Sequence, residues 1–217
     1  MSESSYAAAE LGAGAALAAV RHACSGAGNA FAAVRPPGHH ALADFPMGFC
    51  LLANAVIAAR EGQALGRERV LIVDWDVHHG NGTQALVEQD PSIRFVSLHQ
   101  WPLYPGTGAA DERGVGNVFN LPRPPGLPPG QYVADLMAAV DTALQGFQPD
   151  LLLISAGYDS MRGDPLGGFT LEPEHYAELV GALRDRCPAT PIVGLLEGGY
   201  APELLAEGVI ATLQALV

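Results

Sequence analysis

The stretch Val70-Leu-Ile-Val-Asp-Trp-Asp-Val-His-His79 decides the fold of this chain. Its apolar first part predicts a strand over residues 70–75 that is buried on both faces, as the strands of a parallel sheet are. Polar side chains that could do chemistry follow at once, and in open parallel sheets ligands bind at this carboxyl edge. The stretch therefore predicts a buried strand that ends in a functional site.

Apolar runs of the same kind recur along the chain, bounded by Gly and Pro and separated by longer helical segments. The predicted strands cover residues 30–34, 70–75, 93–98, 151–155 and 192–196. The predicted helices cover residues 7–22, 49–61, 81–88, 131–145, 173–186 and 202–216. This alternation is typical of βαβ units, so we expect residues 1–217 to form a single α/β domain with a mainly parallel sheet flanked by helices. The Pro-rich segment 121–130 is expected to be an ordered surface loop.

Composition excludes several classes of protein. Hydrophobic residues make up 49% of the chain and charged residues 16%, which excludes a disordered or fibrous protein. The net charge of -12 argues against a partner that is a nucleic acid or an anionic membrane. The three widely spaced cysteines form no CxxC pair, and no apolar run is long enough to cross a bilayer. We therefore expect a cytoplasmic enzyme of bacterial type in a reducing compartment.

Polar residues follow four of the five predicted strands at their carboxyl ends. The four blocks are Arg35-Pro-Pro-Gly-His-His40, Asp74-Trp-Asp-Val-His-His79, the segment from Ala156 to Asp164, and Glu197-Gly-Gly-Tyr200. Because the loops at this edge of a parallel sheet converge on one crevice, we expect the four blocks to form a single site.

Asp74, Asp76 and His78 have the spacing of a metal site. Residues at i, i+2 and i+4 of a strand point to one side, and carboxylate oxygen with imidazole nitrogen suits zinc or ferrous iron. A further ligand must come from another strand end, where Asp159 and Asp164 are the candidates. The plainer alternative is that these side chains only cap loops.

The adjacent His39 and His40 follow a backbone that Pro36 and Pro37 stiffen. An imidazole beside a metal site can take a proton from metal-bound water and pass it on, although the pair could equally supply further ligands or form a solvated turn. Tyr200 could offer its phenol to a developing oxyanion, because the two glycines before it let the backbone come close. The alternative for Tyr200 is a loop that begins a helix.

The same residues resemble the signature blocks of the histone deacetylase family, in order and at family spacing over most of the chain. The blocks are Arg35-Pro-Pro-Gly-His-His40, Met47-Gly-Phe-Cys50, Asp74-Trp-Asp-Val-His-His-Gly-Asn-Gly-Thr83, Ser97-Leu-His99, Tyr104-Pro-Gly-Thr-Gly108, Gly163-Asp-Pro165 and Glu197-Gly-Gly-Tyr200. They resemble the class II and bacterial amidohydrolase branch, including the acetylpolyamine amidohydrolases, more than class I.

The resemblance implies two metal ions. One is a catalytic zinc held by Asp76, His78 and Asp164, which leaves Asp159 as a loop residue. The other is a structural potassium, held by Asp74, Asp76, His78, Ser97 and the Leu98 carbonyl.

The resemblance also assigns catalytic roles. His40 would be the general base and then the acid, and His39, held by Asp74, would assist it electrostatically. Tyr200 would stabilise the oxyanion, and Asn81 would give His40 a neutral partner. The substrate tunnel would have Phe49 and Tyr104 as its walls and the Gly48 region as its floor.

The implied reaction is the hydrolysis of an acetylated amine, such as acetyl-lysine or an acetylpolyamine, to acetate and a free amine. The alternatives are an esterase that acts on small acetyl esters and a non-catalytic zinc-binding scaffold. Compared with the family, we expect the chain to lack the first strand and the early helices, either as a natural short form or as a fragment of a longer chain. We therefore expect a wide pocket mouth and uncovered apolar surface that favours a homo-oligomer. The alternative is a monomer in which residues 7–22 cover the gap.

Overall fold

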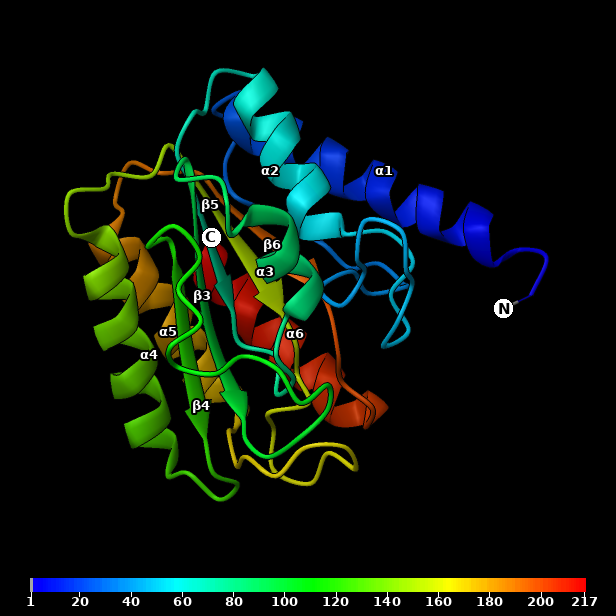
Figure 1. Ribbon diagram of the computed structural model, residues 1–217, viewed down its shortest axis with the longest axis vertical. Helices are drawn as coiled ribbons and strands as arrows, with labels where there is room; N and C mark the ends of the chain where they lie inside the picture. The colour runs from blue at the N-terminus through cyan, green and yellow to red at the C-terminus, as the bar shows by residue number, and fades with distance from the viewer. Residues whose placement is uncertain (1) are drawn as a thin grey trace.

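A six-stranded sheet with the order β1-β6-β5-β2-β3-β4 forms the centre of the structure (Figure 1). The computed structural model describes residues 2–217. The strands are β1 (Ala30–Ala32), β2 (Val70–Asp74), β3 (Ile93–Gln100), β4 (Val118–Arg123), β5 (Leu151–Ala156) and β6 (Ile192–Leu196). The helices are α1 (Ser5–Cys24), α2 (Asn54–Ala64), α3 (Asn81–Val87), α4 (Pro129–Leu144), α5 (Pro173–Arg186) and α6 (Pro202–Leu216). Neighbouring strands pair in parallel throughout this sheet, which confirms the predicted fold class.

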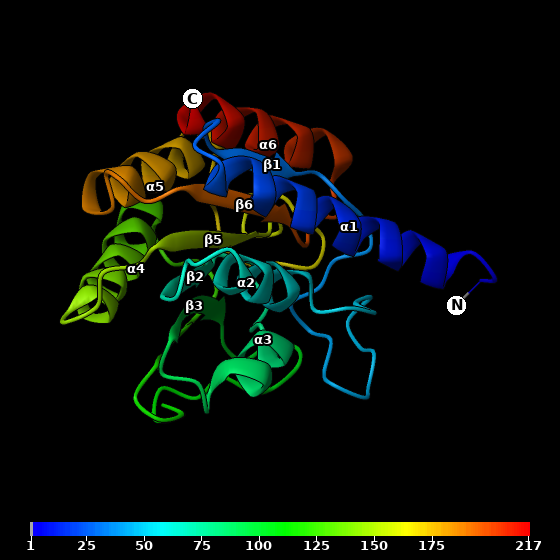
Figure 2. The ribbon, with the colours of Figure 1, turned by 90° about the horizontal axis from the view of Figure 1, so that it is seen from above.

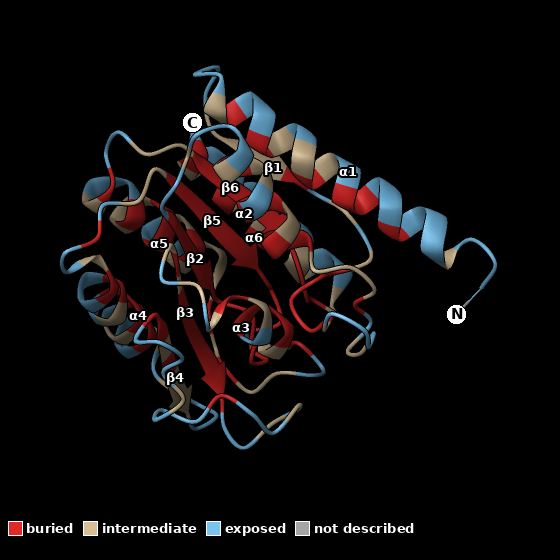
Figure 3. Cartoon of the chain, turned by 45° about the horizontal axis from the view of Figure 1, so that its top comes forward, coloured by how far each residue is buried: buried red, intermediate tan, exposed pale blue. Residues whose placement is uncertain are grey.

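Helices cover both faces of the sheet, with α1, α2 and α3 on one face and α4, α5 and α6 on the other (Figure 2). Alternate residues of β2 contribute to the two cores. Val70 and Ile72 lie in the core beneath α1 and α2, whereas Leu71 and Val73 lie in the core beneath α4 and α5. The central strands are therefore buried along their length (Figure 3), as expected when helices lie on both sides.

Local signals explain where three of the helices begin. Pro129, Pro173 and Pro202 stand in the first turns of α4, α5 and α6, where the missing N–H costs no helical hydrogen bond. In α5, the Glu172 side chain also accepts the backbone N–H of His175, and the His175 ring accepts the backbone N–H of Glu172. These signals place the first residues of α5 and α6 at the predicted positions.

Two predictions of local structure are wrong. The sequence predicts no strand at β4, whose last residues fall in the segment 121–130 that is expected to be a loop. Pro122 argues against a central strand, but β4 is an edge strand, where a residue without an N–H is tolerated. The helix predicted from residue 49 begins at Asn54, because Phe49 has a φ of 64°, outside the helical region. This helix also ends three residues later than predicted, at Ala64, and the other predicted bounds lie within two residues of the structure.

The carboxyl ends of the strands bring the predicted polar blocks to one edge. β1, β6, β5 and β2 are consecutive in the sheet, so the loops that follow them are neighbours. Asp74, the last residue of β2, lies in register with Ser97 on β3 and with Ser155 on β5. In the part of the chain that the structure describes, no helix combines the length and apolar character needed to span a membrane.

Candidate active site

A cavity of about 450 Å³ opens at the carboxyl edge of the sheet. It is lined by His40, Gly48, Phe49, His78, Leu103, Tyr104, Leu166 and Tyr200. All of these except Leu103 and Leu166 are residues that the sequence predicts for the site. A cavity of about 530 Å³ near the opposite edge contains none of the predicted residues.

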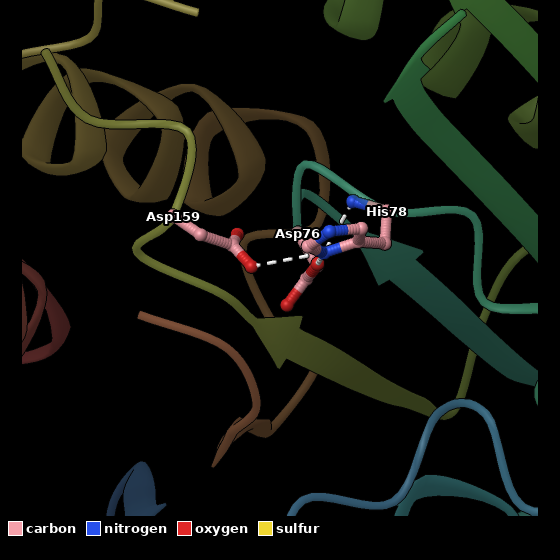
Figure 4. A group of neighbouring side chains, drawn as sticks. All are labelled: Asp76, His78 and Asp159. Carbon is pink, nitrogen blue, oxygen red and sulfur yellow. Dashed lines mark hydrogen bonds and ion pairs between the residues drawn. The ribbon is translucent and has the colours of Figure 1, made fainter. Parts of the chain in front are cut away.

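Asp76, His78 and Asp159 bring three ligand atoms together below this cavity (Figure 4). The His78 Nδ1 atom lies 3.0 Å from Asp76 Oδ1 and 3.1 Å from Asp159 Oδ2, and the three ligand atoms lie within 4.8 Å of one another. The strand ends at Asp74, yet the alternation continues beyond it, because Trp75 and Val77 point into the core. The predicted same-side placement of Asp76 and His78 therefore holds in the loop.

The electrostatics of this cluster favour a bound cation. Burial by itself lowers the pKa of His78, but Asp159 and Asp76 outweigh it and raise that pKa to about 10. Burial and the neighbouring Asp76 raise the pKa of Asp159 to about 7. Burial opposes ionisation of Asp76, but the charges of His39 and His78 hold its pKa below the usual range. Buried carboxylates thus hold a proton on the imidazole, at a place where a metal ion would supply the positive charge instead.

The donor set and its spacing fit zinc. Neighbouring ligands of a tetrahedral zinc site, bonded at 2.0–2.1 Å, lie about 3.3 Å apart, close to the separations found around His78 Nδ1. His78 also lines the cavity, so a metal ion held here would be reached from it. The residues present therefore fit a catalytic zinc with an open position.

Asp164 lies apart from the three-residue cluster. Its Oδ1 accepts the backbone N–H of Leu166 at 2.9 Å, and its Oδ2 accepts the backbone N–H of Tyr200 at 2.7 Å. The structure thus brings Asp159, the candidate that the resemblance sets aside, next to His78, and it places Asp164 beside two residues that line the cavity. Asp159 is fully buried and Asp164 is 6% exposed.

The two predicted histidines have different partners. His39 Nδ1 lies 3.0 Å from the Asp74 carboxylate, whereas His40 Nδ1 lies 2.7 Å from the amide oxygen of Asn81. Burial alone lowers the pKa of His39, but Asp76 and Asp74 raise it well above the usual value. Burial, followed by the charge of His39, lowers the pKa of His40 to about 3. His40 is therefore neutral at pH 7 and can accept a proton, which is the requirement for a general base.

Aromatic side chains form the walls of the cavity. Tyr104 meets the His40 ring edge-on with ring centroids 5.2 Å apart, and Phe49 lies 6.1 Å from the Tyr200 ring. Phe49 is 69% exposed and Tyr104 is 46% exposed, so both present apolar surface to an entering ligand. A Cβ atom at Gly48 would overlap the His40 ring, so the close approach of this backbone requires glycine.

Tyr200 is the phenol of the predicted site, and it lines the cavity together with His40 and His78. Burial raises the pKa of its phenol well above the usual value, so the hydroxyl keeps its proton. A protonated phenol at the cavity wall can stabilise an oxyanion.

The residues proposed for potassium lie behind this site. Asp74, Ser97 and Leu98 are fully buried, and Asp74 faces Ser97 across the β2–β3 pairing. The Ser97 hydroxyl also lies 2.9 Å from the His99 ring. The structure therefore brings these residues together, with the serine oxygen already in contact with an imidazole.

Glu197 is the site residue that the sequence reasoning missed. It is fully buried, and its Oε2 accepts the backbone N–H groups of Gly38 at 2.7 Å and His39 at 3.1 Å. The only signal in the sequence is its place directly after a strand, at the start of the block that ends in Tyr200.

Comparisons with known proteins agree with the resemblance. The model of the histone deacetylase domain matches residues 1–216. An uncharacterized protein of Synechocystis is 47% identical over 219 residues, which cover 100% of this chain and 71% of that protein. A probable deacetylase of Archaeoglobus fulgidus is 40% identical over 81% of this chain and 51% of its own length. Histone deacetylase 15 of Arabidopsis thaliana is 44% identical over 87% of this chain and 36% of its own length.

The fold has a close structural relative. The crystal structure of the HDA15 HD domain matches 96% of this chain with a TM-score of 0.92 and 43% sequence identity. The chain covers 61% of that solved chain, so it spans well under the full length of most of these relatives.

Proposed function

The chain belongs to the histone deacetylase family, and on that premise we propose that it is a zinc-dependent hydrolase of acetylated amines such as acetyl-lysine or acetylpolyamines. One observation carries the proposal: His40, Tyr200 and His78 line the same cavity, and they offer a neutral imidazole, a protonated phenol and an imidazole of the candidate metal cluster. These are the groups needed to remove a proton from water, stabilise an oxyanion and hold a metal ion.

Asp76 and His78 would hold the zinc together with Asp159. We favour Asp159 over Asp164, which the resemblance names, because Asp159 Oδ2 lies 3.1 Å from His78 Nδ1 within the cluster of ligand atoms, whereas both oxygens of Asp164 accept backbone N–H groups. His78 lines the cavity, so a metal ion in this cluster would keep a position open to the substrate. Asp164 would instead hold the backbone of Tyr200. When bound, zinc lowers the pKa of a coordinated water molecule and polarises the acyl carbonyl.

The protein side chains perform the proton transfers. His40 takes the proton of the attacking water on Nε2, because its Nδ1 faces the Asn81 oxygen and so carries the ring proton. Tyr200 donates its hydroxyl proton in a hydrogen bond to the oxygen of the tetrahedral adduct. His40 then gives its proton to the leaving amine as the C–N bond breaks, which yields acetate and the free amine. His39, paired with Asp74, sits beside His40 as a positive charge that keeps its pKa low.

The remaining expectations belong to the same proposal. A structural potassium at Asp74, Asp76, His78, Ser97 and Leu98 is supported by the burial of these residues and by the register that pairs Asp74 with Ser97 on neighbouring strands. A cytoplasmic location is supported by three cysteines that are free in the described residues.

Zinc content measured together with turnover tests the proposal. We expect Asp76→Ala and Asp159→Ala to lose zinc and acetyl-lysine hydrolysis together, and Asp164→Asn to keep zinc with reduced turnover. Asp150→Asn is the matched control, because this carboxylate pairs with Arg69 on the surface at the other edge of the sheet. Full zinc occupancy in Asp159→Ala with loss in Asp164→Asn would transfer the ligand role to Asp164. Full zinc occupancy in Asp76→Ala would refute the metal site.

A deacetylating esterase is the second candidate. The exposed Phe49 and Tyr104 leave a mouth that admits leaving groups other than an amine, and the same catalytic groups would cleave an acetyl ester, which is intrinsically easier to hydrolyse than an amide. Parallel assays on an acetyl-lysine peptide, an acetylpolyamine and an aryl acetate rank the candidates. Zinc binding without turnover on any of the three would leave a non-catalytic scaffold.

A further inference from the structure

The four residues after β6 hydrogen-bond to the loop that carries His39 and His40 and to two carboxylates of the candidate site. The Glu197 carboxylate holds the backbone of Gly38 and His39, the Gly198 N–H donates to Asp76 Oδ2, the Gly199 carbonyl accepts from Arg35, and the Tyr200 N–H donates to Asp164 Oδ2. The segment 197–200 is therefore a junction between residues 35–40, which we call the histidine loop, the carboxylates of Asp76 and Asp164, and the phenol of Tyr200.

Glu197 is the only side chain of this junction that reaches the histidine loop through a charged group. Both backbone N–H groups that it accepts meet a single oxygen, Oε2. They belong to consecutive residues, Gly38 and His39, and His40 follows directly. A carboxylate at this place fixes the direction of the peptide that carries the base. It also satisfies two buried N–H groups that would otherwise lack an acceptor.

The second oxygen of Glu197 indicates that this residue does more than fill space in the core. Oε1 has no hydrogen-bond partner among residues 2–217, although Glu197 is fully buried. A buried carboxylate with one unsatisfied oxygen is costly, and such groups concentrate where function demands them. An apolar residue would pack this volume at lower cost, so the two N–H contacts are what the carboxylate provides.

We propose that Glu197 is a positioning residue that fixes the His39–His40 backbone relative to the Tyr200 segment, so that the base and the oxyanion donor keep their spacing. The inference rests on the proposed deacetylation. Glu197 does not line the cavity, and it is outside the cluster of ligand atoms around His78, so it acts through the backbone of His39 rather than on the substrate or the metal.

The contacts predict that the position of the Glu197 Oε2 atom matters more for catalysis than the charge of its carboxyl group. Burial raises the pKa of Glu197 to about 7, and Oε2 can accept the two N–H groups whether or not the carboxyl group is ionised. The amide oxygen of glutamine, on a side chain of equal length, can do the same. Aspartate keeps the charge, but its side chain is one methylene shorter and withdraws the oxygen from both N–H groups.

The experiment compares Glu197→Gln with Glu197→Asp. We expect Glu197→Gln to keep kcat on an acetyl-lysine peptide within about threefold, and Glu197→Asp to lower it about 10²-fold, the cost of a displacement of about 1 Å in a catalytic group. KM and zinc content should stay unchanged in both variants. The loss in Glu197→Asp should be about tenfold smaller on an aryl acetate, because an aryl oxide leaves without a proton from His40.

Asn117→Ala is the control for destabilisation alone. Asn117 is buried and donates to the carbonyls of Val87, Asp90 and Ile93, at the amino end of β3 and away from the cavity. This variant should lower the melting temperature and leave kcat and the amide-to-ester ratio unchanged.

Three results overturn the inference while the wild type is active. They are full kcat in Glu197→Asp, a loss in Glu197→Gln as large as that in Glu197→Asp, and equal losses on the amide and the ester. A variant that fails to fold counts against the inference when it is Glu197→Gln, because an isosteric change should preserve both contacts. A wild type without turnover on any acetylated amine refutes the proposed function itself, and this inference with it.

Discussion

Substitution of Asn81 by aspartate tests the role of His40, because it changes the charge of one partner and little else. The Asn81 oxygen lies 2.7 Å from His40 Nδ1, and the Asn81 amide nitrogen donates to the Met47 sulfur at 3.4 Å. The same loop contains the opposite arrangement, since His39 has a carboxylate partner, Asp74, and a pKa well above the usual value.

The expected shift follows from Coulomb's law. A carboxylate whose charge lies about 4 Å from the imidazolium charge stabilises it by about 4 kcal/mol at an effective dielectric constant near 20. At 1.36 kcal/mol for each unit, this raises the pKa of His40 by about three units, from about 3 to about 6. The base acts only when it is neutral. Asn81→Asp should therefore lose kcat/KM as the pH falls through about 6, where the wild type keeps its activity.

The assay is the pH profile of kcat/KM on an acetyl-lysine peptide, measured with zinc content at each pH. Gln148→Glu is the matched control, because it adds the same charge at an exposed position on the opposite edge of the sheet and should leave the profile unchanged. An acidic limb at the same pH in Asn81→Asp and wild type would show that His40 is not the base.

Three further outcomes are expected. Tyr200→Phe should keep zinc and fold but lose about 10² to 10³ in turnover, equivalent to roughly 3 to 4 kcal/mol; activity within a factor of two of wild type would mean that the phenol does not serve the oxyanion. An acetyl-lysine peptide should be hydrolysed faster than an acetylpolyamine, because no described residue that lines the cavity carries a carboxylate to pair with a second ammonium group. Kinetics with both substrates at equal ionic strength check this prediction, and equal values of kcat/KM would contradict it. The protein should form an oligomer, because α1 projects beyond the sheet (Figure 1) and exposes 61% of Tyr6 and 76% of Leu11; light scattering coupled to gel filtration should give more than the monomer mass, and a monomer mass across the micromolar range would exclude the oligomer.

The sequence predicts most of the fold because the strand signal is local. Every strand buried on both faces reads as an apolar run, and Val70 to Val73 shows this most clearly. β4 has intermediate burial at several positions and contains Pro122, so its sequence resembles a loop. Its pairing with β3 is a contact between distant segments, which no local pattern encodes.

The sequence predicts which residues form the candidate site better than it predicts which of them contact one another. The motif residues His40, His78 and Tyr200 line one cavity, as the convergence of strand ends requires. The choice between Asp159 and Asp164 depends on how a loop folds back onto His78, and both lie in the same segment after β5. The role of Glu197 depends on its contacts with His39 and Gly38. These residues precede it in the chain by 158 and 159 positions, so only the folded structure brings them together.

The place of β6 in the sheet also governs the order in which the protein can become active during synthesis. β1 pairs with β6 alone among the described strands, and Ala30 lies in register with Val193. Synthesis must therefore proceed from β1 to β6 before β1 acquires this neighbour. Until then, the backbone N–H groups of Gly38 and His39 lack the acceptor that Glu197 supplies, and Tyr200 has not yet been synthesised. The proposed active site is then completed in one late step, when β6 takes its place between β5, the strand made just before it, and β1, which was made long before.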